Sequence, residues 1–394
     1  MATTYSIAII GAGNAGVSLA ARLRRDGHQS VVLIDPHPTH RYRPMLNYTA
    51  TGLAPRRVRE KPMTAVVPDG VDLIRDHAVR VDAETRQVLL ASGKEVGYGD
   101  LVICPGLTQD WASIRGLREG FTTGWAASAH VPEDVHQARR SMAAITRGTV
   151  VFAVPTEPSS CGGTVLKALL AACAGWQKRG VLADLDVHLV TPHDGLLGLE
   201  PADSRVAPYV REYGITVHER SVVLDVDEGA QSVTLGGWDT SVLTGVTLAY
   251  VTPPSRAPEF IADSGLAAPG TPGLVDVDSR TLRHVRHDHV WGLGDAATLD
   301  TRPSGGALRA QASVLADNLD ADRRGGPLRH YDGYTIVPIA VSSTKALLAE
   351  HTRDGARASS VPFVDLTIPR RSTYLFDRYV QPLVYFHRLL RGHV

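Results

Sequence analysis

Three glycines near the start of the chain have the spacing that lets a backbone hold a phosphate group. Gly11, Gly13 and Gly16 follow the pattern Gly-x-Gly-x-x-Gly. In this pattern the first glycine makes a tight turn, the second lets the backbone approach a pyrophosphate, and the third lets a helix pack closely on a strand. Residues 7–10 favour a buried strand before the glycines, and residues 17–25 favour a helix after them. The free N–H groups at the start of that helix would bind the pyrophosphate.

An acid and a second glycine segment extend this candidate site. The next strand pattern ends in Asp35, at the distance expected of a carboxylate that binds ribose hydroxyls. Asn14 and Ala15 complete the phosphate loop, and Gly294 and Asp295 end an apolar run much later in the chain. Two such segments at opposite ends of one chain predict a single dinucleotide site built from distant stretches. This arrangement favours FAD over NAD.

Length, charge and cysteine content exclude several other classes of protein. The 394 residues are enough for two domains and a third, smaller one. The chain has 41 basic and 41 acidic residues, so it lacks the excess of positive charge that is typical of nucleic-acid-binding proteins. Three cysteines are too few for a secreted disulfide framework, and no uninterrupted apolar stretch is long enough to span a bilayer. Because the first strand begins close to Met1, we expect no signal peptide and a cytoplasmic protein.

The middle of the chain repeats the opening pattern of strand, loop, helix and strand. The repeat covers residues 148–191, with its loop at residues 156–163. We therefore expect an α/β fold with two Rossmann-like dinucleotide-binding domains and a small C-terminal amphipathic region. The expected units are an FAD-binding domain from residues 1–112 and 271–335, a second Rossmann-like domain at 113–270, and the C-terminal region at 336–394. The other expected elements are strands of an antiparallel insert at 72–81 and 86–90, a strand ending at residue 104, a helix at 132–147, and strand-like alternation up to residue 249.

The loop of the second unit differs from the first where a dinucleotide would bind. Counted from Pro155 to Gly163, the stretch contains Pro155, Pro158 and Cys161, and proline lacks the N–H group that would hold a phosphate. The loop thus argues against NAD(P)H at this position. Cys161 precedes the helix of this unit, whose dipole favours a thiolate, and this indicates a reactive thiol. The alternative is a small buried residue without chemistry, which is also what we expect of Cys104 and Cys173.

Six segments together carry a resemblance to a known family. They are the loop from Gly11 to Gly16 with Asp35, residues 40–45 (His-Arg-Tyr-Arg-Pro-Met), residues 101–106, the proline-rich loop with Cys161-Gly-Gly, residues 292–295 (Gly-Leu-Gly-Asp) and residues 331–335 (Tyr-Asp-Gly-Tyr-Thr). In these segments the chain resembles the flavoproteins with two dinucleotide-binding domains, and among them the sulfide:quinone oxidoreductases and their flavocytochrome c relatives. The resemblance covers nearly the whole length. It implies an FAD enzyme that passes electrons from sulfide, through cysteines and flavin, to a quinone.

The resemblance also implies which residues hold the cofactor. Asp295 would bond the ribityl chain, the helix after Gly305 and Gly306 would face the pyrimidine edge of the flavin, and Val79 would lie near the adenine. Arg43, Pro105 and Gly106 belong to the matching motifs and join the expected binding set. By the same analogy, Lys345 would line the quinone or substrate side.

One position departs from the family pattern. The family pairs the cysteine at Cys161 with another just after the Tyr-Asp-Gly-Tyr-Thr motif, and that position here holds Val337. A disulfide needs two Cα atoms within about 7 Å, whereas Cys173 lies about 18 Å further along the expected helix. Two alternatives therefore stay open. One is an enzyme resembling type II NADH:quinone dehydrogenases, in which cysteines are dispensable, and the other is a flavin-binding redox partner without turnover.

Candidate bases and metal ligands follow from the titratable residues. Glu157 and His193 are expected near the cleft of the second unit, where either could move a proton to flavin or substrate. We take Cys161 and Glu157 as the catalytic candidates; an exposed loop position is the alternative for both bases. The histidines within residues 283–289 resemble a metal tract, but their place just before a strand favours a solvated turn. We expect no metal site.

Residues 370–391 combine apolar and aromatic side chains with flanking arginines. The apolar side chains recur at helical spacing as Leu375, Phe376, Tyr379, Val380 and Leu383, continued by Phe386, Leu389 and Leu390. Such a segment is typical of a helix that lies in the membrane interface, and the family reaches lipid quinone with this region. The alternatives are a helix pair packed on the flavin domain and a homodimer contact. The expected partners are a small-molecule electron donor and a quinone-like acceptor, and the expected location is the cytoplasm or the inner face of the membrane.

Overall fold

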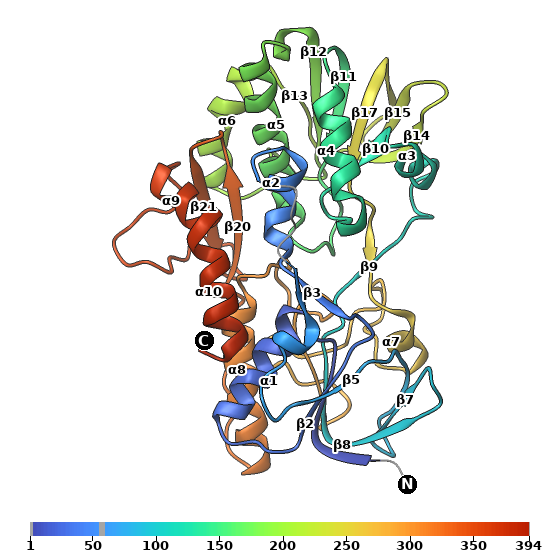
Figure 1. The fold of residues 1–394 in the computed structure, drawn as a ribbon, viewed down its shortest axis with the longest axis vertical. Helices are drawn as coiled ribbons and strands as arrows, with labels where there is room; N and C mark the ends of the chain where they lie inside the picture. Colours follow the sequence, from blue (N-terminus) through green and yellow to red (C-terminus); the bar gives the residue numbers. More distant parts are fainter. Residues whose placement is uncertain (1–2, 55–59, 394) are drawn as a thin grey trace.

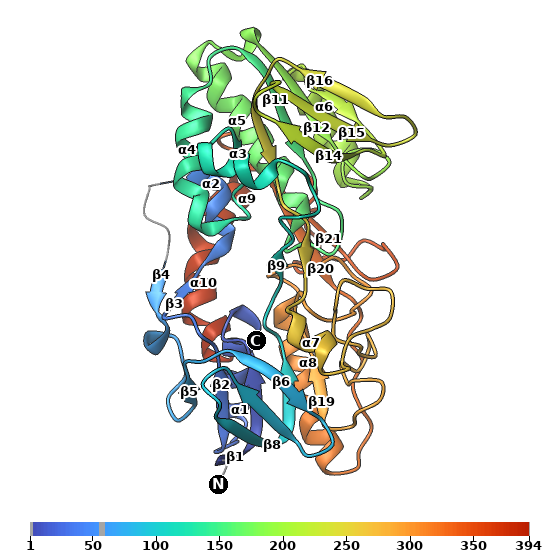
Figure 2. The ribbon, with the colours of Figure 1, turned by 90° about the vertical axis from the view of Figure 1, so that its right-hand side faces the viewer.

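The structure, a computed structural model that describes residues 3–54 and 60–393, has two lobes (Figure 1). The lower lobe in this view contains the first and the later segments of the chain, in blue and orange, and the upper lobe contains the green middle segment. Two short strands run between the lobes and pair antiparallel, β9 (Thr108–Gln109) and β18 (Ser255–Arg256) (Figure 2). The expected α/β fold with two Rossmann-like units is confirmed.

The lower lobe is built on a seven-stranded sheet in the order β5-β2-β1-β8-β7-β6, with β19 paired to β8. Its strands are β1 (Thr3–Ile10), β2 (Val31–Ile34), β5 (Asp72–Ile74), β6 (Ala78–Asp82), β7 (Gln87–Leu90), β8 (Glu95–Ile103) and β19 (Val290–Gly292). The predicted buried strand at residues 7–10 is the inner half of β1, where every residue is buried. Because β1 is parallel to β2, β8 and, through β8, to β19, the carboxyl ends of these strands meet at one edge. The helices α1 (Asn14–Arg25) and α8 (Leu308–Arg323) begin near that edge and pack side by side.

The expectation of one strand at residues 72–81 is wrong. β5 joins the parallel sheet beside β2, and β6 pairs antiparallel with β7. Between them the chain turns at Asp76, whose side chain accepts the N–H group of His77 at 2.8 Å. A short aspartate turn of this kind offers the backbone an alternative to the ladder.

The upper lobe is built on a five-stranded sheet in the order β10-β17-β11-β12-β13, in which every pair is parallel. Its strands are β10 (Ala126–Ala127), β11 (Gly148–Ala153), β12 (Leu185–Val190), β13 (Thr216–His218) and β17 (Val246–Val251). The helix α5 (Val165–Arg179) is apolar on nearly all sides and lies in the core of this lobe. The predicted strand, loop, helix and strand of residues 148–191 are therefore confirmed.

The strand-like alternation expected up to residue 249 is wrong for α6 (Ala202–Glu212). Ala202, Val206 and Val210 are buried at a spacing of four residues, which is the helical period. The carboxylate of Asp203 accepts the N–H groups of the residues before the helix, Leu197 at 2.9 Å and Gly198 at 2.8 Å among them. The polar residues between these apolar positions conceal the helical period in the sequence.

The remaining elements of the two lobes are short. They are β3 (Thr39–Arg41), η1 (Arg43–Met45), α2 (Leu46–Ala50), β4 (Glu60–Pro62), η2 (Met63–Ala65), α3 (Leu117–Thr123), η3 (Pro132–Asp134), α4 (Val135–Ala144), η4 (Gly162–Thr164), η5 (Leu182–Asp184), β14 (Val222–Asp227), β15 (Ser232–Gly236), β16 (Ser241–Thr244) and α7 (Glu259–Asp263). The helix expected at residues 132–147 is present as η3 and α4. Although α2 comes from the first segment of the chain, it packs against α4 and α5 in the upper lobe (Figure 1).

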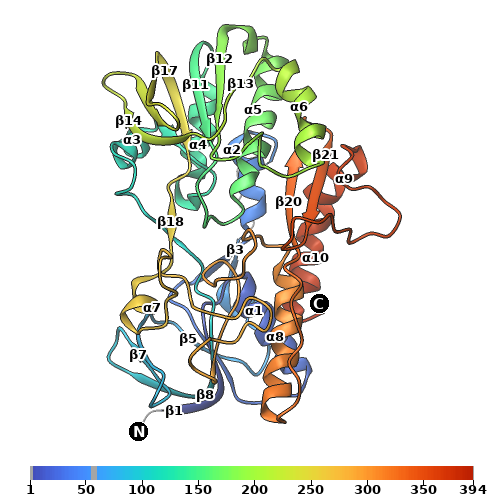
Figure 3. The same cartoon turned by 180° about the vertical axis from the view of Figure 1, so that it is seen from behind.

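The last part of the chain lies along one side of both lobes (Figure 3). It consists of the hairpin β20 (Thr335–Ala340) and β21 (Ala346–His351), then α9 (Arg371–Leu375), the π-helix η6 (Phe376–Val380), α10 (Gln381–His387) and η7 (Leu389–Arg391). Val337 and Leu347 of the hairpin pack in the core of the upper lobe, whereas Phe386 and Leu390 pack in the core of the lower lobe. The domain boundaries expected at residues 112, 270 and 335 stay a prediction. Among the helices of the described residues, none has the length and apolar character needed to cross a membrane.

Candidate active site

The backbone around Gly11, Gly13 and Gly16 has the geometry that a bound pyrophosphate requires. Gly11 has a φ of +106°, and a Cβ there would meet the backbone of Cys104. A Cβ on Gly16 would overlap the carbonyl oxygen of Gly11, so Gly16 sets how closely α1 packs on β1. At Gly13, no atom of the described chain lies within 4 Å of the Cβ position. The open position is thus the glycine whose backbone has to approach the phosphate, and α1 begins at the next residue, Asn14.

Asp35 is fixed at the end of β2, beside this loop. Its carboxylate accepts the N–H groups of Ala12 at 2.7 Å and His37 at 2.8 Å, and the His37 ring lies 2.9 Å away. Burial acts to raise the pKa of Asp35, but the hydrogen bonds from His37 and Ala12 outweigh it, and the pKa lies below its usual range. A charged carboxylate therefore stands where the sequence predicts a ribose contact.

Asp295 and Gly305 close the site from the later segment. Asn14 Nδ2 donates to the Gly305 carbonyl at 3.1 Å, which joins the first glycine loop to the loop before α8. The Asp295 carboxylate accepts a hydrogen bond from the Ser160 hydroxyl. Burial raises the pKa of Asp295, while the Ser160 hydrogen bond and the charge of Arg43 act in the opposite direction. Asp295 thus links the expected FAD site to the loop that bears Cys161.

The other residues expected to bind FAD lie on elements around this site, and their assignment stays a prediction. Arg43 in η1 donates to the carbonyl of His130 at 3.1 Å. The remaining positions are Ala15, buried at the start of α1; Pro105 and Gly106, directly after β8; Gly294, whose N–H group donates to Gln311 at 2.9 Å; Gly306, where a Cβ would overlap the Ile336 side chain; and Val79, exposed on β6.

Cys161 begins the helical segment of η4 and α5, as the sequence predicts. Its φ of +56° lies in the left-handed region, which non-glycine residues rarely adopt. Its N–H group donates to the carbonyl of Pro303 at 3.1 Å, and its carbonyl accepts the N–H group of Thr164 at 2.9 Å. The Cys161 loop is therefore anchored to the chain between Asp295 and α8.

The expectation that the helix dipole favours a thiolate at Cys161 is wrong. Burial raises the pKa of the Cys161 thiol to about 11, and the charge of Asp295 adds to this effect. The Gly305 backbone and Arg43 act in the opposite direction but are outweighed. Removing a thiolate from water disfavours the charged form, and this is the largest cause of the raised pKa. The sulfur is therefore a thiol at neutral pH, and its use as a nucleophile requires a base.

His130 is a functional candidate that no sequence motif indicates. Its Nε2 lies 3.3 Å from the Cys161 carbonyl oxygen, and its Nδ1 lies 3.3 Å from the Thr252 hydroxyl. Burial lowers the pKa of His130 to about 4, so the ring is neutral at neutral pH. The parallel order of β10, β17 and β11 brings His130 to Cys161 across 31 residues of sequence, which no local pattern reveals.

Glu157 and His193 are brought together around Arg302. The Cβ position of Gly198 is 3.6 Å from His193 Cβ and 3.9 Å from Arg302 Nη2. Burial, and next the charge of Arg302, lowers the pKa of His193 to about 4. Although part of Glu157 is open to solvent, the surrounding protein raises the pKa of its carboxyl, and Arg302 opposes that rise. The two bases expected from the sequence thus share one cluster with a cation that the sequence did not single out.

Val337 faces the Cys161 loop. A Cβ on Gly163 would lie 2.9 Å from Val337 Cγ1, so the position at which the family carries its second cysteine is next to this loop. Cys173 packs in the core of the upper lobe, and Cys104 packs against the Gly11 carbonyl at 3.7 Å. All three cysteines are free, and the expected packing roles of Cys104 and Cys173 are confirmed.

Lys345 does not lie beside Cys161, and its assignment to the quinone or substrate side stays a prediction. Lys345 lies in the turn between β20 and β21, where it lines a surface recess with Ala174 and Lys178 near the end of α5. Cys161 precedes the other end of this 15-residue helix, which is about 22 Å long.

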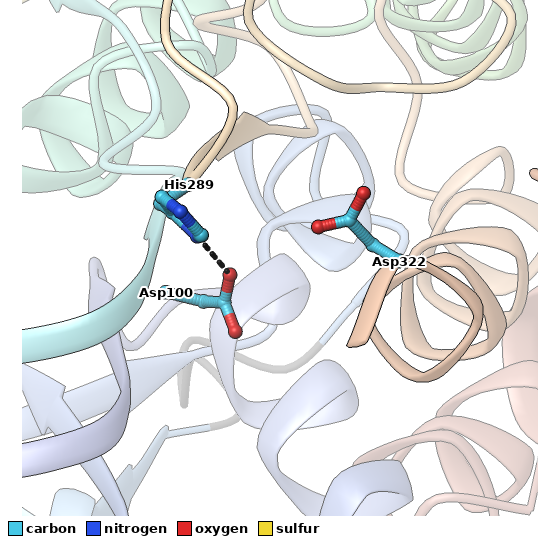
Figure 4. Close-up of side chains that lie close together, drawn as sticks. All are labelled: Asp100, His289 and Asp322. Carbon is cyan, nitrogen blue, oxygen red and sulfur yellow. Dashed lines mark ion pairs between the residues drawn. The ribbon is translucent and has the colours of Figure 1, made fainter. Parts of the chain in front are cut away.

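The histidine tract contributes one residue to a cluster of side chains that offer metal-ligand atoms (Figure 4). Within the described ranges, ligand atoms of Asp100, His289 and Asp322 lie within 4.8 Å of one another. However, Asp100 is already paired with Arg323 at 2.8 Å, and Asp322 with Arg283 at 3.1 Å. Both carboxylates are thus paired with guanidinium groups, and the cluster forms a salt-bridge network.

Comparisons with known proteins agree with this architecture. Residues 5–315 match the family model described as pyridine nucleotide-disulphide oxidoreductase. The mitochondrial sulfide:quinone oxidoreductase of Mus musculus is 27% identical over 394 residues, covering 99% of this chain and 87% of that protein. The sulfide:quinone oxidoreductase structure from Aquifex aeolicus has a TM-score of 0.82 at 18% identity, covering 100% of this chain and 92% of that one. NDH2 from Plasmodium falciparum, solved with NADH, has a TM-score of 0.72 at 12% identity, covering 99% and 96%.

The family match spans most of the chain and includes the glycine loop, Asp35 and Asp295. The backbone opening at Gly13, with the helix start behind it, fits the pyrophosphate of the expected cofactor. The chain belongs to the pyridine nucleotide-disulphide oxidoreductase family and is an FAD-dependent oxidoreductase similar over its whole length to sulfide:quinone oxidoreductases.

Proposed function

We propose that the chain oxidises sulfide or a small thiol at Cys161 and passes the electrons through FAD to a quinone-like acceptor, as the names of its relatives describe. The observation that carries this proposal is the attachment of the Cys161 loop to Asp295 and Pro303, beside the expected FAD site. Ser160 donates a hydrogen bond to Asp295, and the Cys161 N–H group donates to Pro303 at 3.1 Å. A thiol held beside the expected flavin supports a sulfur donor.

The side chains around Cys161 support a role for it as a nucleophile. Bound FAD would supply the ability to accept two electrons from one partner and release them to another. Because the Cys161 pKa of about 11 keeps the thiol protonated at neutral pH, a base has to take its proton. Glu157, whose carboxyl pKa is raised, is the candidate base, whereas His130 donates its Nε2–H group to the Cys161 carbonyl and supports the loop. Arg43 favours the thiolate once it forms, because its positive charge lowers the thiol pKa.

The NADH-oxidising alternative is less well supported by the second loop. A Cβ on Gly162 would lie 3.1 Å from Pro155 Cγ and 3.2 Å from Ser159 Oγ. The glycines of this loop therefore let it fold onto its own side chains, whereas Gly13 leaves its backbone open. The prolines also remove N–H donors. The loop resembles a support for Cys161 more than a dinucleotide cradle.

Anaerobic reduction of the bound flavin tests the proposal. Purified, FAD-loaded protein is mixed with sulfide, with a low-molecular-weight thiol or with NADH, and the flavin absorbance is followed. We expect sulfide or the thiol to bleach the flavin and a quinone to restore the absorbance. Rapid reduction by NADH alone would establish the alternative. Reduction by none of the three would indicate a flavin-binding redox partner without this turnover.

Cys161→Ser separates the role of the thiol from binding of the flavin. We expect the variant to keep its FAD and to lose at least about a hundredfold in the rate of flavin reduction by sulfide, as for removal of a nucleophile. Unchanged reduction kinetics would show that the thiol takes no part. The matched control is Cys173→Ser, at a cysteine buried away from the site.

We also propose that the C-terminal face docks on the cytoplasmic side of a membrane, where the chain would reach a lipid-soluble acceptor. The C-terminal face consists of Leu375, Phe376, Tyr379, Val380, Leu383 and Val384, which are between 40% and 53% exposed. Exposed Arg370, Arg371, Arg388 and Arg391 flank this face. Apolar side chains bordered by arginines suit an interface with anionic lipid headgroups. Association of two chains through this face is the competing outcome.

A further inference from the structure

Arg302 carries a charge that no direct contact in the described chain neutralises. Its guanidinium makes no hydrogen bond or ion pair with any described residue, although the residue is half-buried. The backbone is fixed, because the Arg302 carbonyl accepts the Thr335 hydroxyl at 2.8 Å. Burial lowers the pKa of Arg302, while Glu157 and Asp203 act to raise it from beyond ion-pair distance. A cation in this position is stabilised when an anion binds to it.

Two histidines next to Arg302 also have ring nitrogens without partners in the described chain. The Nδ1 atom of His351 is fully buried and accepts or donates no hydrogen bond. The His193 ring makes no hydrogen bond to the described residues, and its Cβ approaches Gly198, which adjoins Arg302 Nη2. Burial, and then the charge of Arg302, lowers the pKa of both rings. Each neutral ring carries one N–H donor, and both rings lie within electrostatic reach of Arg302.

The two nearby carboxylates do not complete an ion pair with Arg302. Asp203 is already occupied, because its oxygens accept N–H groups of Leu196 at 3.1 Å, Leu197 at 2.9 Å and Gly198 at 2.8 Å. Glu157 Oε2 accepts the N–H group of Ser159 at 2.8 Å and lies too far from Arg302 for a direct ion pair. Glu157 is therefore a neighbour that competes with an external anion rather than the partner of Arg302.

This cationic cluster adjoins the Cys161 loop. The carbonyl of Pro303, the residue after Arg302, accepts the Cys161 N–H group at 3.1 Å. A second contact joins the Cys161 loop to the cluster: the Cβ position of Gly163 is 3.3 Å from the side chain of Leu197, and Leu197 is the residue before Gly198. The charge of Glu157 acts to raise the pKa of both the Cys161 thiol and the Arg302 guanidinium, so the two groups lie near one carboxylate.

We propose that Arg302, with His193 and His351, binds the oxyanion group of a sulfur compound that is oxidised at Cys161: an S–S bond to the compound forms, the protons on sulfur leave to Glu157 or solvent, and the two electrons released pass to the bound FAD. The planar guanidinium offers paired N–H donors that match two oxygens of one oxyanion. The oxyanion comes from one of two sources: an inorganic sulfur oxyanion, or the carboxylate of an organic thiol. This inference deepens the proposed function and rests on it for the reaction, but the anion subsite can be measured without turnover.

The first experiment measures binding with sulfate, an oxyanion that cannot be oxidised. FAD-loaded oxidised protein is titrated with sodium sulfate by calorimetry at constant ionic strength. We expect the wild-type protein to bind one sulfate per chain. In Arg302→Gln we expect the affinity to fall by about tenfold to hundredfold, which is the effect of losing one charge-assisted hydrogen bond. Glu157→Gln is expected to bind sulfate more tightly, because a competing negative charge is removed. The matched control is Arg115→Gln, at an exposed arginine paired with Asp225 on the upper lobe.

The second experiment distinguishes the two sources. The rate of flavin reduction by 3-mercaptopropionate is compared with that by 2-mercaptoethanol, which has a similar thiol and no carboxylate. A preference for the carboxylate thiol that disappears in Arg302→Gln assigns the subsite to organic thiols. Competitive inhibition of sulfide by sulfate that disappears in the same variant, without a thiol preference, assigns it to inorganic oxyanions.

Failure of the subsite and failure of the proposed function give different results. If sulfate affinity and donor preference are the same in the wild-type protein and in a folded Arg302→Gln variant, the subsite is overturned even when sulfide reduces the flavin. If sulfate binding depends on Arg302 but no sulfur donor reduces the flavin, the subsite stands and the proposed reaction fails. Arg302→Lys, which keeps the charge without the paired donors, provides a second folded variant and is expected to bind sulfate with intermediate affinity.

Discussion

The ammonium group of Lys167 lies 2.5 Å from Asp377 Oδ2, and the two side chains are only 2% and 1% exposed. The Tyr48 hydroxyl donates to the same oxygen at 2.5 Å, and its ring lies 4.1 Å from the ammonium. Lys167 belongs to α5, the helix that follows Cys161, Asp377 to the π-helix η6, and Tyr48 to α2. One buried ion pair therefore fastens the C-terminal segment to the helix of the candidate active site.

Asp377→Ala should destabilise the protein strongly. It leaves the Lys167 ammonium buried without a counter-ion, a change that costs about 3–5 kcal/mol. The double variant Lys167→Met with Asp377→Leu should lose much less, because no charge stays buried. The measurement is the free energy of unfolding in urea. A single variant within about 1 kcal/mol of the wild type would contradict the burial of this pair.

The surface pair Arg22–Asp26 is the control for this prediction. Its nitrogen and oxygen are 2.7 Å apart, but the side chains are 23% and 28% exposed. Solvent screens such a pair, so Asp26→Ala should change the free energy of unfolding by about 1 kcal/mol or less.

Gly13→Ala should remove the cofactor without unfolding the chain. The Cβ position of Gly13 is open to 4 Å in the described structure, and its φ of −72° is accessible to alanine. The added methyl group would occupy the space that the pyrophosphate needs. We expect an unchanged thermal midpoint of the FAD-free protein and a flavin content below about a tenth of the wild type. Flavin absorbance and FAD titration check both.

Gly16→Ala provides the contrast within the same loop. Its Cβ would overlap the Gly11 carbonyl oxygen, so the helix and strand have to separate. We expect the FAD-free protein to lose about 1–3 kcal/mol of stability, in the range of overpacked cores. If Gly16→Ala leaves that stability unchanged and Gly13→Ala lowers it, the assigned roles of the two glycines are reversed.

The alkylation of Cys161 should depend on pH in the manner of a high-pKa thiol. The thiolate is the reactive form, and a pKa of about 11 makes its fraction rise tenfold per pH unit throughout neutral pH. We expect the iodoacetamide rate, followed by mass spectrometry, to rise with a slope of one from pH 7 to about pH 10. Arg43→Gln should slow the reaction at each pH, because the Arg43 charge lowers the thiol pKa. A plateau below pH 8 would show that Cys161 is a thiolate at neutral pH.

The C-terminal face should decide membrane binding. Leu375, Tyr379 and Leu383 are each 53% exposed, and burying such side chains in lipid contributes about 1 kcal/mol or more apiece. Their simultaneous replacement by serine should reduce sedimentation with anionic vesicles at least about tenfold. The control replaces Leu224, Trp238 and Val242, which are exposed on the upper lobe. If the first variant only converts a dimer to a monomer in solution, the face is a contact between two chains.

For the C-terminal segment, the sequence pattern predicts the helix correctly but does not determine which of its faces is buried. The helical spacing of apolar residues predicts an amphipathic segment, and both an exposed face and a packed face exist. Leu383 is 53% exposed, whereas Phe386 and Leu390 are buried against the lower lobe. Spacing assigns these residues to faces of a helix, but the hairpin and the Lys167–Asp377 pair determine which face turns inward.

The sequence alone was sufficient for the phosphate loop, the two Rossmann-like units and the start of a helix at Cys161. These features depend on glycine spacing and on apolar periodicity over short stretches, which local sterics and burial dictate. The sequence also determined that valine occupies the position next to the Cys161 loop at which the family carries a cysteine. The position of Val337 follows from the Tyr-Asp-Gly-Tyr-Thr motif just before it. The contact between Val337 and Gly163 agrees with a place next to the Cys161 loop.

Only the tertiary structure decided the chemistry around Cys161. His130 reaches the Cys161 carbonyl from the turn after β10, and Arg302 arrives with the later segment of the chain, so no local spacing could indicate either residue. The thiol pKa depends on burial and on charged groups from several segments, and it is raised where the helix start alone suggested a lowered value. Lys167 and Asp377 are 210 residues apart and form an ion pair because the two lobes and the C-terminal segment pack together. The sequence determines which chemical groups are present, and long-range packing determines their charge and their neighbours.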